Sequence, residues 1–395
     1  SFETYQVLQP GDIVIRPTDL QNDKTSLRVG RVRHRGIITS AYLGLRARGI
    51  SAKYAFTYLA ALDQMKIFYG MGSGLRQNLD FRDFKRLPVP VPPASEQAAI
   101  VKYLAHAHAR IDRAIAAKRK LTTLLEEQTQ AVIQHAVTRG LDPSVPLKDS
   151  GLPWLGEIPS HWSTARLATV GQFFKSHGGS REDDVENGAA CVRYGDLYKL
   201  NAPTISVAPT RISDESSAHY TLVRKGDILF ALSGESREDI GKSSVNLIEE
   251  PTYCAGDTAV LRPSSNCLPE FLAYALASSY GAGQKIVRGR GDIIVHISTG
   301  ALKQVRLAIP PRAEQQAIAK VIAESIATAI ETKLRIESEI VLLREFRTRL
   351  TSDVVTGQVD VRKIAATLPE LSEAGEVFND EDIAEFAPEF ASTDE

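Results

Sequence analysis

This 395-residue sequence has few cysteines and no long apolar run, and both absences restrict its class. Cys191, Cys254 and Cys267 are an odd number without a C-x-x-C pair, which argues against a disulfide framework and against a cysteine zinc site. No run of 18 apolar residues occurs that could cross a bilayer, so we expect no membrane association. No basic-then-apolar leader opens the sequence, and a reducing cytoplasm is therefore the predicted location.

The sequence also lacks recognised catalytic patterns. Its eight histidines have no metal-ligand spacing, and neither H-E-x-x-H, G-x-S-x-G nor the Asn-Pro-Pro-aromatic motif of amino-methyltransferases occurs. The stretch "SGESREDIGKSS" resembles a phosphate-binding loop, but six residues separate Gly234 from Gly241 where that loop requires four. A predicted strand follows it instead of a helix. We therefore expect a chain that is not itself an enzyme and binds no metal or cofactor.

Negative charge is concentrated at one end of the chain. Residues 364–395 hold ten Asp and Glu and no Lys or Arg, so residues 1–363 carry an excess of nine positive charges. A basic body suits a polyanionic partner, although an ordinary solvated surface with an acidic tail has the same composition. The tail, residues 361–395, is expected to be disordered.

An internal repeat organises the rest of the sequence. "VPPASEQAAIVKYL" (91–104) returns 218 positions later as "IPPRAEQQAIAKVI" (309–322), with seven of fourteen residues identical. The similarity continues for about fifty residues downstream. It also extends upstream, where "PGDIVI" (10–15) matches "KGDILF" (225–230). Each unit is therefore a β-rich segment, a proline hinge and a long helix.

Apolar periodicity after each hinge predicts the helices. In the first copy the steps alternate between four and three, as in a coiled coil, through Ile100, Leu104, Ala107, Ile111, Ala114, Lys118, Leu121, Leu125, Gln128 and Val132. The second copy has a similar but broader stripe. Helices of about forty residues and roughly 60 Å need a partner, and we expect them to pair with each other, with His106 and His108 on the outer side. The alternative is that each helix packs flat on its own β-domain.

These patterns divide the chain into five parts: a first β-rich domain (1–90), a hinge and helix (91–140), a linker and second domain (141–308), a second hinge and helix (309–360) and the tail (361–395). The second domain shows short strand-like runs and a helical patch at 269–280. The first is shorter and has nothing that corresponds to "GLPWLGEIPSHWSTARLATVGQFF" (151–174). We expect it to be the C-terminal part of such a domain.

Polar loops that join Arg or Lys to Gly, Ser, Asn and Tyr provide the remaining chemistry. These side chains can donate hydrogen bonds to base edges and to phosphates, although a solvated turn has the same composition. The candidate DNA contacts are Arg16, Asn22, Lys24, Arg28, Ser73, Arg76, Gln77 and Asn78 in the first copy, and Ser180, Arg181, Arg193, Tyr194, Arg237, Lys242, Arg288 and Arg290 in the second.

Residues 1–363 resemble the specificity subunits of type I restriction-modification systems. The residues that carry the resemblance are "GLPWLGEIPSHW", "KGDILFALSG", "IPPRAEQQAI" and "LTSDVVTGQVDVR", the last three of which have counterparts in the first copy. The resemblance implies an α+β fold in which two α/β target-recognition domains, the first one partial, are separated by two long antiparallel coiled-coil helices with pseudo-two-fold internal symmetry.

The same resemblance implies a non-catalytic, sequence-specific DNA-binding subunit that takes part in phage defence. It would read a split, asymmetric target on double-stranded DNA. It would also recruit two methyltransferase subunits, which use S-adenosylmethionine to methylate adenine, and restriction subunits, which use ATP and Mg²⁺. Helix length would set the unread spacer between half-sites. The alternative is an orphan or decoy coiled-coil protein of the same fold without a role in DNA specificity.

Overall fold

The structure is a computed structural model that describes residues 5–20, 27–71, 78–291 and 294–370. It divides into two compact units. Unit 1 comprises residues 1–121 and 335–395, and unit 2 comprises residues 122–334. Two long helices, α3 (Ala94–Arg139) and α9 (Arg312–Val355), contribute to both units. Both begin just after the paired prolines of the predicted hinges, because proline suits the start of a helix and cannot continue one.

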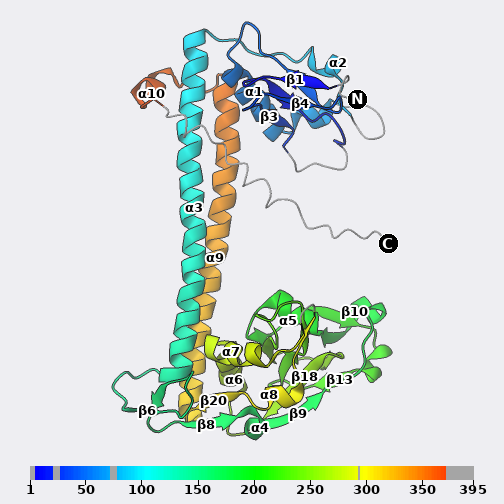
Figure 1. Cartoon of the computed structure of the whole chain (residues 1–395), viewed down its shortest axis with the longest axis vertical. Coiled ribbons are helices and arrows are strands. Elements are labelled where there is room, and N and C mark those ends of the chain that lie inside the picture. Colours follow the sequence, from blue (N-terminus) through cyan, green and yellow to red (C-terminus); the bar gives the residue numbers. More distant parts are fainter. Residues whose placement is uncertain (1–4, 21–26, 72–77, 292–293, 371–395) are drawn as a thin grey trace. The chain divides into compact units, whose positions relative to one another are not determined.

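Among the described residues, unit 2 contains two larger sheets with α6 (Pro269–Ala277) and α7 (Ser279–Arg288) beside them (Figure 1). The first sheet has the order β11 (Thr204–Ile205), β16 (Ser243–Asn246), β14 (Ile228–Ala231), β18 (Thr258–Pro263) and β9 (Gly171–Lys175). The second has the order β12 (Thr210–Ile212), β10 (Asp184–Val192), β17 (Thr252–Cys254) and β13 (Thr221–Val223).

Shorter elements complete the described part of unit 2. Three further strand pairs are β6 (Leu147–Asp149) with β7 (Glu157–Pro159), β8 (Ser163–Arg166) with β20 (Arg306–Ile309), and β15 (Ser233–Gly234) with β19 (Val295–His296). The short helices are α4 (Leu167–Val170), α5 (Tyr194–Leu200) and α8 (Thr299–Leu302), together with 3₁₀ turns at Arg181–Asp183 and Ser216–His219. Many short strands joined by polar loops leave several loop tips free to carry function.

Unit 1 repeats the centre of this arrangement with fewer strands. Its elements are β1 (Gln6–Leu8), β2 (Ile13–Ile15), β3 (Val29–Arg31), β4 (Gly36–Ile38), β5 (Leu43–Leu45), α1 (Ala52–Gln64), a 3₁₀ turn (Ile67–Gly70), α2 (Phe81–Phe84) and α10 (Arg362–Thr367). The sheet order β3-β2-β5 matches β16-β14-β18, and the pair β1-β4 matches β13-β17. In the described part of unit 1, β5 has no neighbour corresponding to β9.

One ion pair recurs at the same place in both sheets. In unit 2, both nitrogens of an Arg262 fork donate to the two oxygens of Asp227 at 2.8 and 2.7 Å. In unit 1, Arg46 donates to Asp12 over the same two distances. The two aspartates follow the glycine of the repeated Gly-Asp motif. The repeat read from the sequence is therefore a repeat of contacts as well as of residues.

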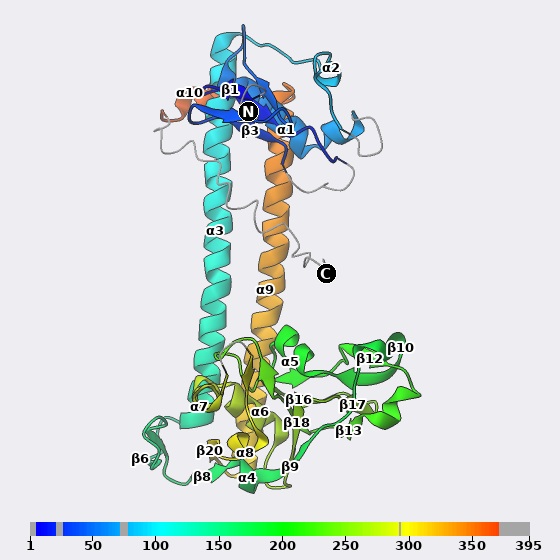
Figure 2. The same ribbon diagram turned by 45° about the vertical axis from the view of Figure 1, so that its right-hand side comes forward.

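In each unit α3 and α9 lie side by side and antiparallel, which confirms the expected pairing (Figures 1 and 2). In unit 1, Asp112 accepts a hydrogen bond from Arg347 at 2.8 Å, and Lys118 further along α3 pairs with Glu339, which is earlier in α9. In unit 2, Glu126 pairs with Lys333. The chain direction is opposite in the two helices at every one of these contacts.

The predicted seam of α3 is wrong by one residue at several positions. Ile115 is buried where the periodicity selects Ala114, and Leu121 is 45% exposed. His108, expected on the outer side, is 4% exposed and its Nε2 lies 2.9 Å from Thr351 Oγ1. The pKa of His108 is lowered to about 3, because burial and the Arg347 charge both disfavour its protonated form. Because His108 is polar, a count of apolar residues does not show that this position belongs to the buried seam.

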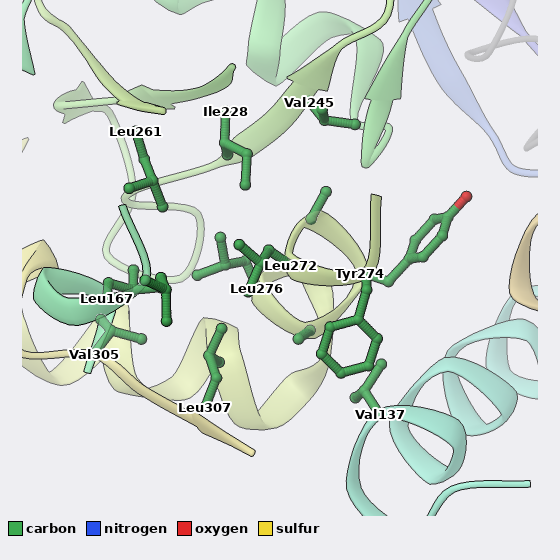
Figure 3. Packing of buried hydrophobic residues seen from close by; sticks show 14 of the residues in the cluster. Val137, Leu167, Ile228, Val245, Leu261, Leu272, Tyr274, Leu276, Val305 and Leu307 are labelled. Carbon is green, nitrogen blue, oxygen red and sulfur yellow. The ribbon is translucent and has the colours of Figure 1, made fainter. Parts of the chain in front are cut away.

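Each domain core is closed by the start of one long helix and the end of the other. In unit 1 the core includes Ile100 and Leu104 of α3 with Val354 and Val355 of α9. The core of unit 2 is closed by the residues at the matching positions of the repeat. There Ile318 and Ile322 at the start of α9 pack with Ala136 and Val137 at the end of α3. Figure 3 shows Val137 in the same cluster as strand and helix side chains of the domain, such as Leu272 and Leu307. The helices therefore belong to the cores and are not separate rods.

Part of the expected tail is folded. Residues 362–367 form α10, and Val361 and Ala365 are each 2% exposed within unit 1. Lys102 of α3 pairs with Glu370 at 2.7 Å. Residues 371–395 lie outside the described part of the chain. The expected disorder is therefore wrong for residues 361–370, because apolar Val361 and Ala365 are buried there and anchor a helix.

Candidate nucleic-acid interface

Two loops of unit 2 that carry predicted DNA contacts lie next to each other. The loop 235–242 follows β15 and the segment 288–291 comes before β19, and β15 pairs with β19. Arg237 Nη2 donates to the carbonyl of Gly291 at 3.3 Å. Two backbone bonds, at 2.9 and 2.7 Å, join Arg290 to His296 at the end of β19. Both Arg237 and Arg290 have exposed side chains, so the pairing of two short strands brings two cations to one edge.

A buried lysine supports the first of these loops. Lys285 of α7 is 3% exposed, and its Nζ donates to Gly241 O at 2.8 Å and to Ser243 Oγ at 3.4 Å. Burial, with a smaller effect from Lys242, lowers the pKa of Lys285 to about 7. Lys285 could not be predicted as part of this site, because nothing in its local sequence distinguishes a buried lysine from a solvated one.

Two of the predicted DNA contacts at the ends of these loops, Lys242 and Arg288, bond to other groups of the protein. Lys242 pairs with Asp239 at 3.0 Å and keeps 27% of its side chain exposed. Arg288 donates to the carbonyl of Gln284 at 2.6 Å and is half-buried. A cavity of about 170 Å³ lies behind the loop, lined by Lys242 and Lys285 and by Ile133 of α3. The cavity therefore lies between this loop, the rest of the domain and α3.

The second group of predicted contacts surrounds the start of α5. Arg181 and Tyr194 are exposed there. Ser180 caps the following 3₁₀ turn by accepting from Glu182 N at 3.2 Å. Arg193 differs from the prediction: 14% of its side chain is exposed, and its guanidinium pairs with Asp184 and donates to Ser180 O at 2.6 Å. It also lies 5.7 Å from the centre of the Tyr220 ring, so its donors are used internally.

Helix α5 connects the two groups. It begins beside Arg193 and Tyr194, and Tyr198, one turn later, donates its hydroxyl to Ser233 O at 2.8 Å. Ser233 in turn contacts His296 Nδ1 through its Oγ at 2.8 Å. Burial and nearby Asp239 raise the pKa of Tyr198 to about 12, so its hydroxyl remains a donor. Arg181, Tyr194, Arg237 and Arg290 are consequently exposed donors on segments held in one hydrogen-bonded frame.

Fewer of the predicted DNA contacts can be located in unit 1. Five of the eight lie outside the described residues: Asn22, Lys24, Ser73, Arg76 and Gln77. Asn78 accepts from Asp19 N at 2.9 Å, which ties the loop after β2 to the segment before α2. Arg16 is half-buried at the end of β2.

Arg28 is not available to DNA, which corrects its assignment. Its side chain is 2% exposed and donates to the carbonyls of Thr18 at 2.6 Å and Asp19 at 3.1 Å, with the Tyr69 ring 5.1 Å away. Its backbone N–H donates to buried Asp63. Asp63 has its pKa raised by burial despite these donors. Arg28 organises the loop 16–20 from inside, and the sequence alone could not distinguish that role from surface recognition.

This arrangement provides hydrogen-bond donors and positive charge. Within the ranges that the structure describes, no group of three His, Cys, Asp or Glu is placed to hold a metal ion. None of the helices in those ranges is long and apolar enough to cross a membrane. Exposed arginines on adjacent loop tips can contact base edges and phosphate oxygens, which are the acceptors that a DNA groove presents.

Comparison with known proteins gives a consistent family. A family model described as "Type I restriction modification DNA specificity domain" matches residues 40–126 and 187–340. The type I restriction enzyme MjaVIII specificity subunit of Methanocaldococcus jannaschii is 25% identical over 345 residues, which cover 84% of this chain and 76% of that protein. The EcoKI specificity subunit of Escherichia coli K12 is 23% identical over 210 residues, covering 52% of this chain and 44% of that protein.

Solved structures show the same fold. A chain from a study titled "Structural basis underlying complex assembly and conformational transition of the type I R-M system" aligns with a TM-score of 0.66 at 16% identity, covering 90% of this chain and 84% of that one. The HsdS subunit from Thermoanaerobacter tengcongensis aligns with a TM-score of 0.52 at 17% identity, covering 89% and 82%. At these identities the alignments show the fold alone.

Proposed function

The chain belongs to the family of type I restriction-modification DNA specificity subunits, and from that premise we propose that it reads a bipartite, asymmetric target on double-stranded DNA. Each recognition domain reads one half-site. The long helices fix the number of base pairs between the half-sites. The chain is a non-catalytic member of its complex and supplies specificity to subunits that do the chemistry.

The duplicated frame is the observation that supports this proposal. The strands that both domains share have the same order, and both domains have the same Asp–Arg pair and the same attachment to the start of one helix and the end of the other. Their loops differ in sequence, "GSGLRQN" in one and "GRGDIIVH" in the other. One frame with two different loop sets suits the reading of two different half-sites.

Exposed cations in unit 2 provide the DNA contacts. We assign Arg181, Arg237 and Arg290 to this surface, together with the hydroxyl and ring of Tyr194. Arg193 and Arg288 position these loops, because their guanidinium groups are bonded to the protein. Phosphate contacts of this kind make affinity fall steeply with salt, whereas base contacts make it depend on sequence.

The partners follow from the family. We propose that two methyltransferase subunits bind the chain and use S-adenosylmethionine, and that restriction subunits join them and use ATP and Mg²⁺. Those cofactors would be bound by the partner subunits. A DNA-associated complex of this kind would act in the cytoplasm and defend the cell against phage.

Helix length tests the proposal. First, methylation mapping of DNA from a strain that carries the complete system gives both half-sites and the spacer. Four residues are then inserted in each long helix, between the Lys118–Glu339 and Glu126–Lys333 pairs. The insertion adds about 6 Å of helix. With about 3.4 Å per base pair, the preferred spacer should increase by roughly one to two base pairs.

The control has the same four residues substituted at that place without a change in length. Its preferred spacer should be that of the parent chain. A spacer that stays the same after the insertion, in a complex that still methylates, would contradict the role of the helices as a spacer.

A further inference from the structure

Two buried glutamines occupy the same position in the two hinges. Gln97 and Gln315 are 218 residues apart, and each follows the paired prolines by four residues. Their exposed fractions are 5% and 1%. Next to Gln315 the sequence continues with Gln316, whose side chain is exposed. A buried carboxamide at the first turn of a surface helix needs internal partners for its donors and its acceptor.

The partners of the two glutamines are equivalent. Gln315 Nε2 donates to Pro310 O at 2.8 Å, and Gln97 Nε2 donates to Pro92 O at the same distance. The acceptor sides also match. Gln315 Oε1 accepts from Leu268 N at 2.6 Å, and Gln97 Oε1 accepts from Ser51 N at 2.8 Å. Both copies of the repeat therefore form the same pair of bonds, over equal intervals on the proline side and over intervals of 46 and 47 residues on the other.

The acceptor bond reaches a corresponding element in each recognition domain. Leu268 is the N-cap residue of α6, and Ser51 is the N-cap residue of α1. These are the helices that pack beneath the two sheets. In unit 2 a third bond, from Gln315 Nε2 to Asn266 O at 3.2 Å, reaches the turn that leads into α6. One side chain thus joins the hinge, the spacer helix and the helix of the domain.

Glutamine is suited to this position because its amide donates and accepts at once. The carbonyl of Pro310 lies before the first turn of α9, outside its ladder of backbone hydrogen bonds, and the Gln315 amide supplies it with a donor. The N-cap N–H of α6 is likewise outside the helical ladder. Glutamate would keep the acceptor and lose the donors, and methionine would fill the space without either.

We propose that Gln97 and Gln315 are positioning residues, which fix the angle at which each recognition domain leaves its spacer helix and so restrict the spacer that the protein accepts. This inference rests on the proposed reading of a bipartite target. The domain would keep its own fold and loops without the bond, but it would leave the hinge over a wider range of angles. Spacers that are one base pair too long or too short would then be tolerated.

The first test measures orientation without DNA. Spin labels are placed at cysteines introduced at Val207, on a loop of the domain, and Ala327, on α9, both in unit 2 and both exposed. The native cysteines Cys191, Cys254 and Cys267 are buried. The distance distribution between the labels should widen in Gln315→Met and stay unchanged in the matched control Gln316→Met. An equally narrow distribution in both variants would overturn the proposal.

The second test uses DNA with the full chain. After the target is selected from a random duplex library, affinities are measured for the selected spacer, for spacers one base pair longer and shorter, and for a duplex that keeps only the half-site read by unit 2. Gln315→Met should reduce discrimination between spacers by about tenfold while changing half-site affinity less than twofold. Unchanged discrimination, or equal losses on all duplexes, would count against positioning.

Two further variants distinguish the remaining explanations. Gln315→Glu keeps the size of the side chain and the bond to Leu268 N, but it sets a carboxylate oxygen against the carbonyls of Pro310 and Asn266. It should therefore lose at least as much spacer discrimination as Gln315→Met, which a simple packing defect would not. If Gln315→Met does not fold, Gln97→Met tests the equivalent hinge, with labels at exposed positions of unit 1 and a duplex that keeps only the half-site read by unit 1. A parent chain that shows no spacer preference would refute the proposed function, whereas the label distances would still decide the role of the glutamine.

Discussion

The ion pair of unit 2 gives a sharp prediction for stability. Asp227 is 1% exposed, and Arg262 supplies two of its hydrogen-bond donors at 2.8 and 2.7 Å. The backbone of Arg224 supplies a third at 2.8 Å. Arg262→Met keeps an apolar stem beside Phe174, which the guanidinium now covers at 5.1 Å from the ring centre, but it removes both side-chain donors from the buried carboxylate.

The expected cost follows from the burial of each partner. Removing one member of a buried pair costs about 3–5 kcal/mol. The side chain of Arg262 is 32% exposed, so water can reach the vacated position and the cost should lie at or below the lower end of that range. We expect unit 2 to lose about 2–3 kcal/mol of unfolding free energy. With a urea m-value of roughly 2–3 kcal/mol/M, the midpoint of unfolding falls by about 1 M.

Tryptophan fluorescence makes the assay specific to one unit. The chain has two tryptophans, Trp154 and Trp162, and both lie in unit 2. Arg46→Met removes the corresponding cation in unit 1 and is the matched control, since the tryptophan-reported midpoint should not change. A double variant, Asp227→Asn with Arg262→Met, should recover part of the loss because the charge is removed with its partner. A midpoint in Arg262→Met within about 0.2 M of the parent would refute the reasoning.

Three other predictions follow from the charged groups. Hydrogen bonds from Arg46 lower the pKa of Asp12 to about 2. The stabilisation of unit 1 by this ion pair is therefore complete above about pH 4 and is lost as the pH falls toward 2. Urea unfolding followed by far-UV circular dichroism at pH 5, 3 and 2 measures this loss. Lys285, with a pKa of about 7, is protonated more readily in the unfolded chain, so unit 2 should gain stability between pH 7 and 10, and Lys285→Met should abolish that rise in tryptophan-monitored unfolding. Arg237→Gln and Arg290→Gln should each reduce the slope of log affinity against log salt by about 0.9 for every phosphate that the arginine neutralises in the parent complex; an unchanged slope would exclude both residues from phosphate binding.

The duplicated architecture was accessible from sequence because its signals are local and occur twice. Paired prolines mark where a helix can begin, and uninterrupted runs of about forty residues without Gly or Pro mark how far it extends. The pairing of the two helices followed from their apolar stripes. These features depend on backbone chemistry within a few residues, so a single sequence contains enough information to predict them.

The buried seam of α3 and the recognition residues were harder to predict from sequence, because their positions depend on partners that are distant in the chain. Thr122 is half-buried where an apolar count selects Leu121, since α9 and not α3 decides which side faces inward. Arg28 and Arg193 have the composition of surface contacts, yet each is bonded to carbonyls 9 to 13 residues away. Charge in a polar loop shows that donors are present. It does not show whether the protein or a ligand receives them.

The repeated contacts imply that neither recognition core is complete without both helices. Ile100 and Leu104 open the first helix, but their core is closed by Val354 and Val355 from the end of the second. Deleting the last turns of α9 would therefore expose apolar residues of unit 1, although the strands of unit 1 lie at the other end of the sequence. Loop tips face no such requirement and can differ freely between copies. A change of DNA target should accordingly be possible through the loops alone, whereas the hinges and helix ends must change together or not at all.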